Sequence, residues 1–196
     1  VLINPFQALH PNSDAPGDST LVASDRGAAF DRERYSAWLQ QVREVCARRG
    51  IVLIFDEVFA GFRLACRGAQ EYFGVKADLV TYGKTLGGGL PIGVVCGTHA
   101  LMKRYKEEQP ADISFARGTF NSHPYVMTCM AEFLARIQQP TVQACYATAD
   151  ALWNARVQQL NTALAEAAVP LRLANMHSIH TVLYTQPCRY NWMLQF

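Results

Sequence analysis

The feature that most constrains the fold of this chain is a pair of short apolar runs, each followed by an ionisable residue. Residues 51–55 are all apolar and lead directly to Asp56. Residues 79–82 form a second, largely apolar run that leads, after one glycine, to Lys84. Such runs are typical of strands buried in a parallel sheet. Because open α/β sheets bind ligands outside the carboxyl ends of their strands, we expect Asp56 and Lys84 to lie at a ligand site.

The surroundings of Lys84 are unusual for a lysine. Residues 87–89 are consecutive glycines, and Pro91 follows shortly after. Glycine lets the main chain approach a flat or phosphorylated ligand. An amine buried among Val, Ile and Leu would lose its hydration, and a neutral amine attacks carbonyls. The residues leave two interpretations open, a buried reactive lysine and a turn whose lysine points into solvent.

An acid at one strand end and a lysine at another can hold one planar heteroaromatic cofactor. The lysine forms a Schiff base with the cofactor aldehyde, and the acid keeps the ring nitrogen protonated. This chemistry belongs to pyridoxal 5'-phosphate. A nucleotide phosphate loop is excluded, because its spacing needs a glycine at position 78, where Asp78 stands.

Three segments carry a family resemblance. Residues 51–63 read IVLIFDEVFAGFR, residues 78–97 read DLVTYGKTLGGGLPIGVVCG, and residues 117–124 read RGTFNSHP. Together they resemble the class III aminotransferases, close to glutamate-1-semialdehyde aminomutase. The sequences GTFNSHPYVM and, further on, LYTQPCRYNWMLQ are more similar to aminotransferase modules of polyketide and nonribosomal peptide synthases.

The resemblance implies roles for four residues. Lys84 would carry the Schiff base and move protons as acid and base. Asp56 would pair with the ring nitrogen, and Val58 would pack on one face of the ring. Thr119 would reach the cofactor phosphate of the neighbouring subunit, which implies a homodimer with shared active sites. For Val58, plain core packing stays an open alternative.

Three further residues near these motifs have structural interpretations. Glu57 follows Asp56 on the same strand and is expected to point to the opposite face. We expect Arg63 to tie a turn to neighbouring carbonyls rather than to bind a substrate carboxylate. His123 is expected to cap a helix rather than to act in catalysis. The segment 121–123 reads Asn-Ser-His, where the family more often has Ser-Gly-Asn.

The resemblance also implies the fold and the domain organisation. We expect an α/β fold, part of the large domain of a fold-type I pyridoxal-phosphate enzyme, with a mainly parallel sheet flanked by helices. Residues 1–168 would belong to that domain and residues 169–196 to the start of a small C-terminal domain. Family members are longer on both sides, so we expect a fragment or an excised module. A second phosphate loop and a ring-stacking aromatic would lie upstream.

Helix and strand positions follow from periodicity and from cap residues. We expect strands at residues 1–3, 51–55, 79–82, 92–96, 171–173 and 179–184, with the direction of 92–96 left open, and a long loop at 7–27. Helices are expected from Asp31 to about residue 49, over 70–73, over 99–108, from Pro124 to about residue 137, and from Thr141 to about residue 168. In the last helix, Val142, Cys145, Ala149, Leu152, Trp153, Leu160 and Leu164 form an apolar stripe.

Composition and charge argue against several classes of binding partner. A formal net charge of +2 with scattered basic residues argues against nucleic acid. The absence of a bilayer-length apolar run argues against membrane insertion. Six cysteines without metal-ligand spacing favour reduced thiols, no metal site and a cytoplasmic protein.

The predicted activity is transfer of an amino group from a small-molecule donor to a carbonyl acceptor. The similarity of these two segments to synthase modules suggests a carrier-bound β-keto acyl chain as the acceptor and an acyl carrier domain as a partner. One alternative is an aminomutase that moves the amino group within one molecule. Another is an inactive, truncated piece with a structural or interaction role.

Overall fold

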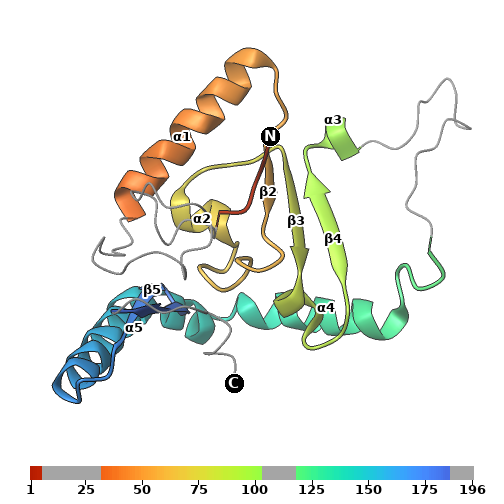
Figure 1. The fold of residues 1–196 in the computed structure, drawn as a ribbon. Helices are drawn as coiled ribbons and strands as arrows, with labels where there is room; N and C mark the ends of the chain where they lie inside the picture. Colours follow the sequence, from red (N-terminus) through yellow and green to blue (C-terminus); the bar gives the residue numbers. More distant parts are fainter. Residues whose placement is uncertain (6–31, 103–117, 186–196) are drawn as a thin grey trace, which may run out of the picture.

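The computed structural model describes residues 1–5, 32–102 and 118–185 (Figure 1). The segments predicted as the 7–27 loop, the Asp31 cap and the helix beyond residue 102 lie outside these residues. The elements are, in order, β1 (Leu2–Ile3), α1 (Arg32–Arg49), β2 (Ile54–Asp56), α2 (Ala69–Phe73), β3 (Leu79–Gly83), the 3-10 helix η3 (Lys84–Gly87), β4 (Gly93–Gly97), α3 (His99–Met102), α4 (Pro124–Ile137), α5 (Pro140–Glu166), β5 (Leu171–Met176) and β6 (Ile179–Tyr184).

A four-stranded sheet forms the centre of the fold, with the strand order β1-β2-β3-β4. β1, β2 and β3 are parallel, and β4 runs antiparallel to β3, which settles the direction left open by the sequence. The predicted α/β fold with a mainly parallel sheet is confirmed. Because β2 and β3 are parallel neighbours, their carboxyl ends lie at the same edge of the sheet.

α1 covers the sheet through the apolar positions that its sequence periodicity predicts. Tyr35, Leu39 and Cys46 are buried in the core with Leu53 and Phe55 of the second strand region. The helix ends at Arg49, and the backbone of the following glycine is left-handed, which is a common way to end a helix. Figure 1 shows α1 and α2 along one side of the sheet and α4 crossing near η3.

The long helix α5 leads to a separate two-stranded antiparallel sheet, in which Leu171 pairs with Tyr184 and Met176 with Ile179. β5 is longer than the predicted strand, because its pairing with β6 continues to the hairpin turn. Asn161 of α5 donates to the Leu173 carbonyl at 2.9 Å and accepts from its N–H at 2.7 Å. This amide anchors the hairpin to the helix. A domain boundary at residue 168 stays a prediction.

One expectation for α5 was wrong, the identity of its N-cap. The helix begins at Pro140 with Gln139 as its N-cap, so Thr141 is not the cap, because proline is favoured at the first helical position. The predicted apolar stripe is mostly uncovered, since Ala149 and Val157 are the only buried residues in this helix. α5 extends beyond the four-stranded sheet. The hairpin of β5 and β6 covers one side of this helix.

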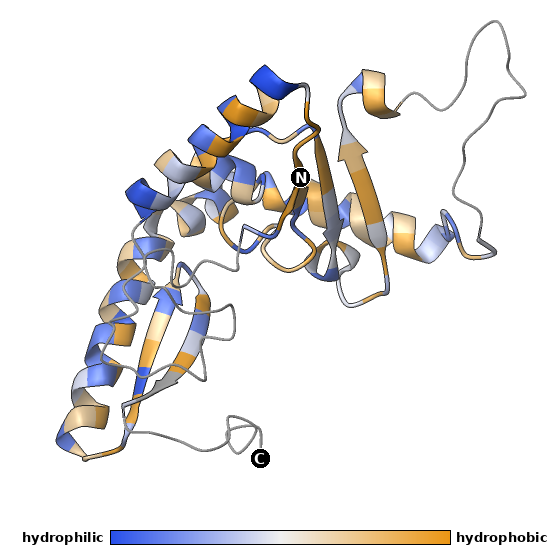
Figure 2. Ribbon diagram, turned by 45° about the horizontal axis from the view of Figure 1, so that its top comes forward, coloured by the Kyte–Doolittle hydropathy of each residue, from blue (hydrophilic) through white to orange (hydrophobic). Residues whose placement is uncertain are grey.

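Figure 2 shows apolar residues concentrated in the four-stranded sheet, whereas the helices alternate polar and apolar positions. Among the residues that the structure describes, none of the helices combines the length and hydropathy needed to cross a membrane.

Candidate active site

Asp56 is the last residue of β2, and two donors hold its carboxylate. The Thr81 hydroxyl donates to Oδ1 at 3.1 Å, and the Val58 backbone N–H donates to the same oxygen at 3.0 Å. Asp56 lies opposite Thr81 in the β2–β3 register. The neighbouring strand therefore fixes the orientation of this acid.

Lys84 follows β3 directly and begins η3. Its backbone has φ of +39°, a left-handed conformation that is rare and strained for a residue with a side chain. Its Nζ lies 5.0 Å from the centroid of the Phe59 ring, within the range of a cation–π contact.

Of the two interpretations that the sequence left open, the described chain agrees with the second, because Lys84 is exposed. The glycines that follow explain part of this exposure. A Cβ at Gly88 or Gly89 would meet nothing within 4 Å, so this side of the loop borders open space. Gly87 instead lies against Ile92, where a Cβ would come within 2.9 Å of the isoleucine side chain.

Val58 lies next to the turn that carries Lys84. A Cβ at Gly83 would be 3.1 Å from the Ile92 carbonyl oxygen and 3.2 Å from Val58 Cγ1, so a larger residue at this position would push Val58 or Ile92 aside by a few tenths of an ångström. Asp56, Val58 and Lys84 thus all lie at the carboxyl ends of β2 and β3, and a ligand site at this edge stays a prediction. An amine and a carboxylate at this edge are suited to hold a flat ring that bears an aldehyde and a basic nitrogen.

Glu57 points away from this edge, in agreement with the expected alternation. Its side chain is buried and accepts hydrogen bonds from the N–H groups of Ala69 at 2.6 Å and Gln70 at 3.3 Å, in the first turn of α2. Burial raises the pKa of Glu57 to about 7, and the two backbone donors offset part of that effect.

Arg63 has the structural contacts that the sequence favours. Its Nε donates to the Phe59 carbonyl at 2.8 Å, and its guanidinium lies 4.8 Å from the Phe59 ring centroid. His123 occupies the N-cap of α4, but its side chain makes no capping hydrogen bond. Its ring instead stacks on the Tyr125 ring, with 5.7 Å between the ring centroids, so the cap comes from the backbone alone.

Thr119 is exposed in the loop before α4. A role for Thr119 in a partner's site stays a prediction.

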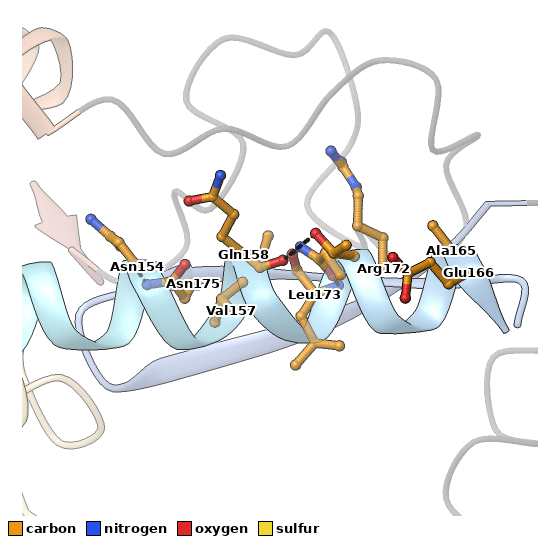
Figure 3. A pocket seen from close by; sticks show the side chains of 11 residues that line it. Asn154, Val157, Gln158, Ala165, Glu166, Arg172, Leu173 and Asn175 are labelled. Atoms are coloured by element: carbon orange, nitrogen blue, oxygen red, sulfur yellow. Dashed lines mark hydrogen bonds between the residues drawn. The ribbon is translucent and has the colours of Figure 1, made fainter.

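A groove of about 680 Å³ lies elsewhere, between α5 and β5 (Figure 3). Its amide side chains largely bond within the fold. Asn161 binds both backbone groups of Leu173, and Asn175 donates to Asn154 at 2.8 Å. Within residues 1–5, 32–102 and 118–185, no cluster of three or more His, Cys, Asp or Glu residues could hold a metal ion.

A model of the class III aminotransferase family matches residues 22–176, and the chain belongs to this family. Glutamate-1-semialdehyde 2,1-aminomutase of Nitratidesulfovibrio vulgaris (strain DP4) is 35% identical over 178 residues, which cover 91% of this chain and 40% of the relative. The enzyme of the same name from Methanococcus maripaludis (strain C5) is 44% identical over 117 residues, covering 60% of this chain and 27% of the relative.

Solved structures give the same fold. The chain is similar to an omega-transaminase from Sphaerobacter thermophilus, with 31% identity and a TM-score of 0.64 over 78% of this chain and 34% of that one. A structure described as a transaminase with PLP bound matches with 31% identity and a TM-score of 0.61, over 74% of this chain and 33% of that one. The chain spans between 26 and 40% of the length of the curated relatives it matches.

The sequence did not predict two of the contacts at the site. Thr81 interrupts an otherwise apolar run opposite Asp56, and that interruption was the only available signal. The proximity of Phe59 to Lys84 had no signal, because it depends on the path of the turn after β2.

Proposed function

We propose that the full-length protein is a pyridoxal-phosphate-dependent enzyme that moves an amino group between carbon atoms. The observation that carries this proposal is that Asp56 ends β2 and Lys84 directly follows β3, so both residues lie at the carboxyl ends of two adjacent parallel strands. Membership of the class III family supports the cofactor.

The residues at this edge fit the cofactor. Pyridoxal phosphate, when bound, supplies an electron sink for the carbon that carries the amino group. Asp56 has a second oxygen, Oδ2, beyond the one that accepts from Thr81 and Val58, and it would pair with the protonated ring nitrogen. Val58 would contact one ring face. Lys84 would bind the cofactor through Nζ and, when released, would hold or deliver a proton at that atom.

Two substrate classes are open within this proposal. The relatives named glutamate-1-semialdehyde 2,1-aminomutase favour an exchange of amino and carbonyl groups within one small molecule. The alternative, a carrier-bound β-keto acyl acceptor supplied by an acyl carrier domain, is supported only by the sequence similarity of segments 118–127 and 183–195 to synthase modules. A homodimer in which Thr119 contributes to the partner's cofactor site belongs to the same proposal.

The attachment residue is tested on the full-length protein loaded with pyridoxal phosphate. Borohydride reduction should fix the cofactor to the peptide that contains Lys84, as mass mapping would show. Lys84→Ala should abolish the labelling, whereas Lys76→Ala, which removes an exposed lysine before β3, should leave it intact. Labelling at another lysine would overturn the assignment, and no labelling at all would favour an inactive structural piece.

The substrate class is tested by the need for a second substrate. Turnover of a semialdehyde without any added amino donor supports the intramolecular exchange. Strict dependence on an added donor, with amination of an acyl carrier substrate, supports the alternative.

A further inference from the structure

Beyond the residues whose roles the family resemblance implies, one side chain touches the proposed cofactor acid. Thr81 lies directly opposite Asp56 in the pairing of β2 with β3, and its hydroxyl donates to Asp56 Oδ1 at 3.1 Å. Both side chains are half-buried, so this contact is only partly screened by water.

Two donors from different parts of the chain meet on the same oxygen. The Val58 N–H belongs to the turn after β2, and the Thr81 hydroxyl belongs to the neighbouring strand. One donor would leave the carboxylate free to turn about its Cβ–Cγ bond. Two donors on Oδ1 restrict that rotation and leave Oδ2 for the ring nitrogen.

We propose that Thr81 is a positioning residue, which holds the Asp56 carboxylate in the orientation that pairs with the ring nitrogen of pyridoxal phosphate. The inference rests on the proposed function. Thr81 lies on β3, and Lys84 directly follows the end of this strand, so β3 both leads to the lysine and orients the acid on the neighbouring strand.

The substitution Thr81→Val tests this role because it removes the hydroxyl and keeps the β-branched shape that suits a strand. A hydrogen bond to a charged group is lost, so we expect the apoprotein to bind pyridoxal phosphate roughly tenfold more weakly. Thr81→Ser keeps the donor and should bind within about twofold of the wild type. Binding is measured on the full-length protein by titration of the visible absorbance.

Two controls separate positioning from folding. The melting temperature of the apoprotein should be nearly the same for Thr81→Val and the wild type. Thr162→Val removes a hydroxyl that donates to the Gln158 carbonyl on α5, and it should leave cofactor binding unchanged.

Each result has a definite meaning. Equal affinity of Thr81→Val and the wild type would overturn the positioning role and leave the proposed function standing. Equal loss in Thr81→Ser and Thr81→Val would also overturn it, since the donor is then not the cause. Failure of the wild type to take up any cofactor would overturn the proposed function and this inference with it.

Discussion

Asp56 and Glu57 are adjacent carboxylates with opposite environments. Asp56 ends β2 at the candidate site, where a hydroxyl and one N–H hold it. Glu57 turns inward and satisfies the first N–H groups of α2. Asp56 therefore lies at the proposed cofactor site, whereas Glu57 stabilises the start of α2.

Glu57 should make the stability of the fold depend on pH. Because burial raises the pKa of Glu57 to about 7, the folded protein binds this proton more tightly than the unfolded chain does. The free energy of unfolding should therefore fall by about 2 kcal/mol between about pH 5 and pH 8 through this group. Urea unfolding at the two pH values measures the effect.

Glu57→Gln provides the comparison for this pH dependence. The amide does not titrate, and it leaves one N–H of α2 poorly satisfied at every pH. We expect a less stable protein whose stability changes less between the two pH values. A pH dependence equal to that of the wild type would show that Glu57 does not titrate in this range.

At the scale of elements, α2 depends on a glycine beside the buried acid. Gly68 is the N-cap of α2 and has φ of +77°, and a Cβ there would come within 2.0 Å of Glu57 Oε2. Gly74, at the other end of the helix, has φ of +68° and no atom within 4 Å of such a Cβ.

This pair of glycines allows a matched prediction. Gly74→Ala adds only backbone strain and should lower the free energy of unfolding by about 1 kcal/mol. Gly68→Ala places an alanine in a backbone conformation (φ 77°, ψ −159°) that essentially only glycine adopts, and it also displaces Glu57, so its loss should exceed that of Gly74→Ala by about 1–3 kcal/mol. Thermal or urea unfolding measures both. Equal losses would contradict both the added strain at position 68 and the displacement of Glu57.

Local signals in the sequence predicted most of the elements. Apolar runs placed β2 and β3, Gly50 ended α1, and Pro124 began α4. The exposure of Lys84 and the uncovered side of α5 could not be predicted, because both depend on which other segments pack there. The pairing of Thr81 with Asp56 depends on strand register, which single-strand patterns do not determine.

At the scale of the molecule, one polar cluster joins three helices. The Asp150 carboxylate of α5 accepts from the Tyr72 hydroxyl at 3.0 Å and from Arg32 of α1 at 3.1 Å. Arg32 also donates to the Tyr72 carbonyl and lies over the Tyr72 ring. The cluster therefore ties α5, which carries the hairpin, to the helices beside the sheet.

We expect Asp150→Ala to weaken this junction. The Tyr72 hydroxyl loses its acceptor inside the fold, so the loss should be about 1–2 kcal/mol in the free energy of unfolding. Glu132→Ala is the control, because it removes an exposed ion pair with Arg136 within α4 and should cost less than about 0.5 kcal/mol. A similar small loss in both variants would show that Asp150 does not join the helices.

The left-handed backbone of Lys84 has a consequence for how its amine could be replaced. The loop, rather than the lysine, fixes the point from which the side chain starts. A cysteine at this position, alkylated to carry an aminoethyl group, would project an amine along nearly the same path. A lysine moved to position 85 would start in a different direction. An aminoethylated cysteine at position 84 should therefore restore attachment of the cofactor, whereas an amine at position 85 should not.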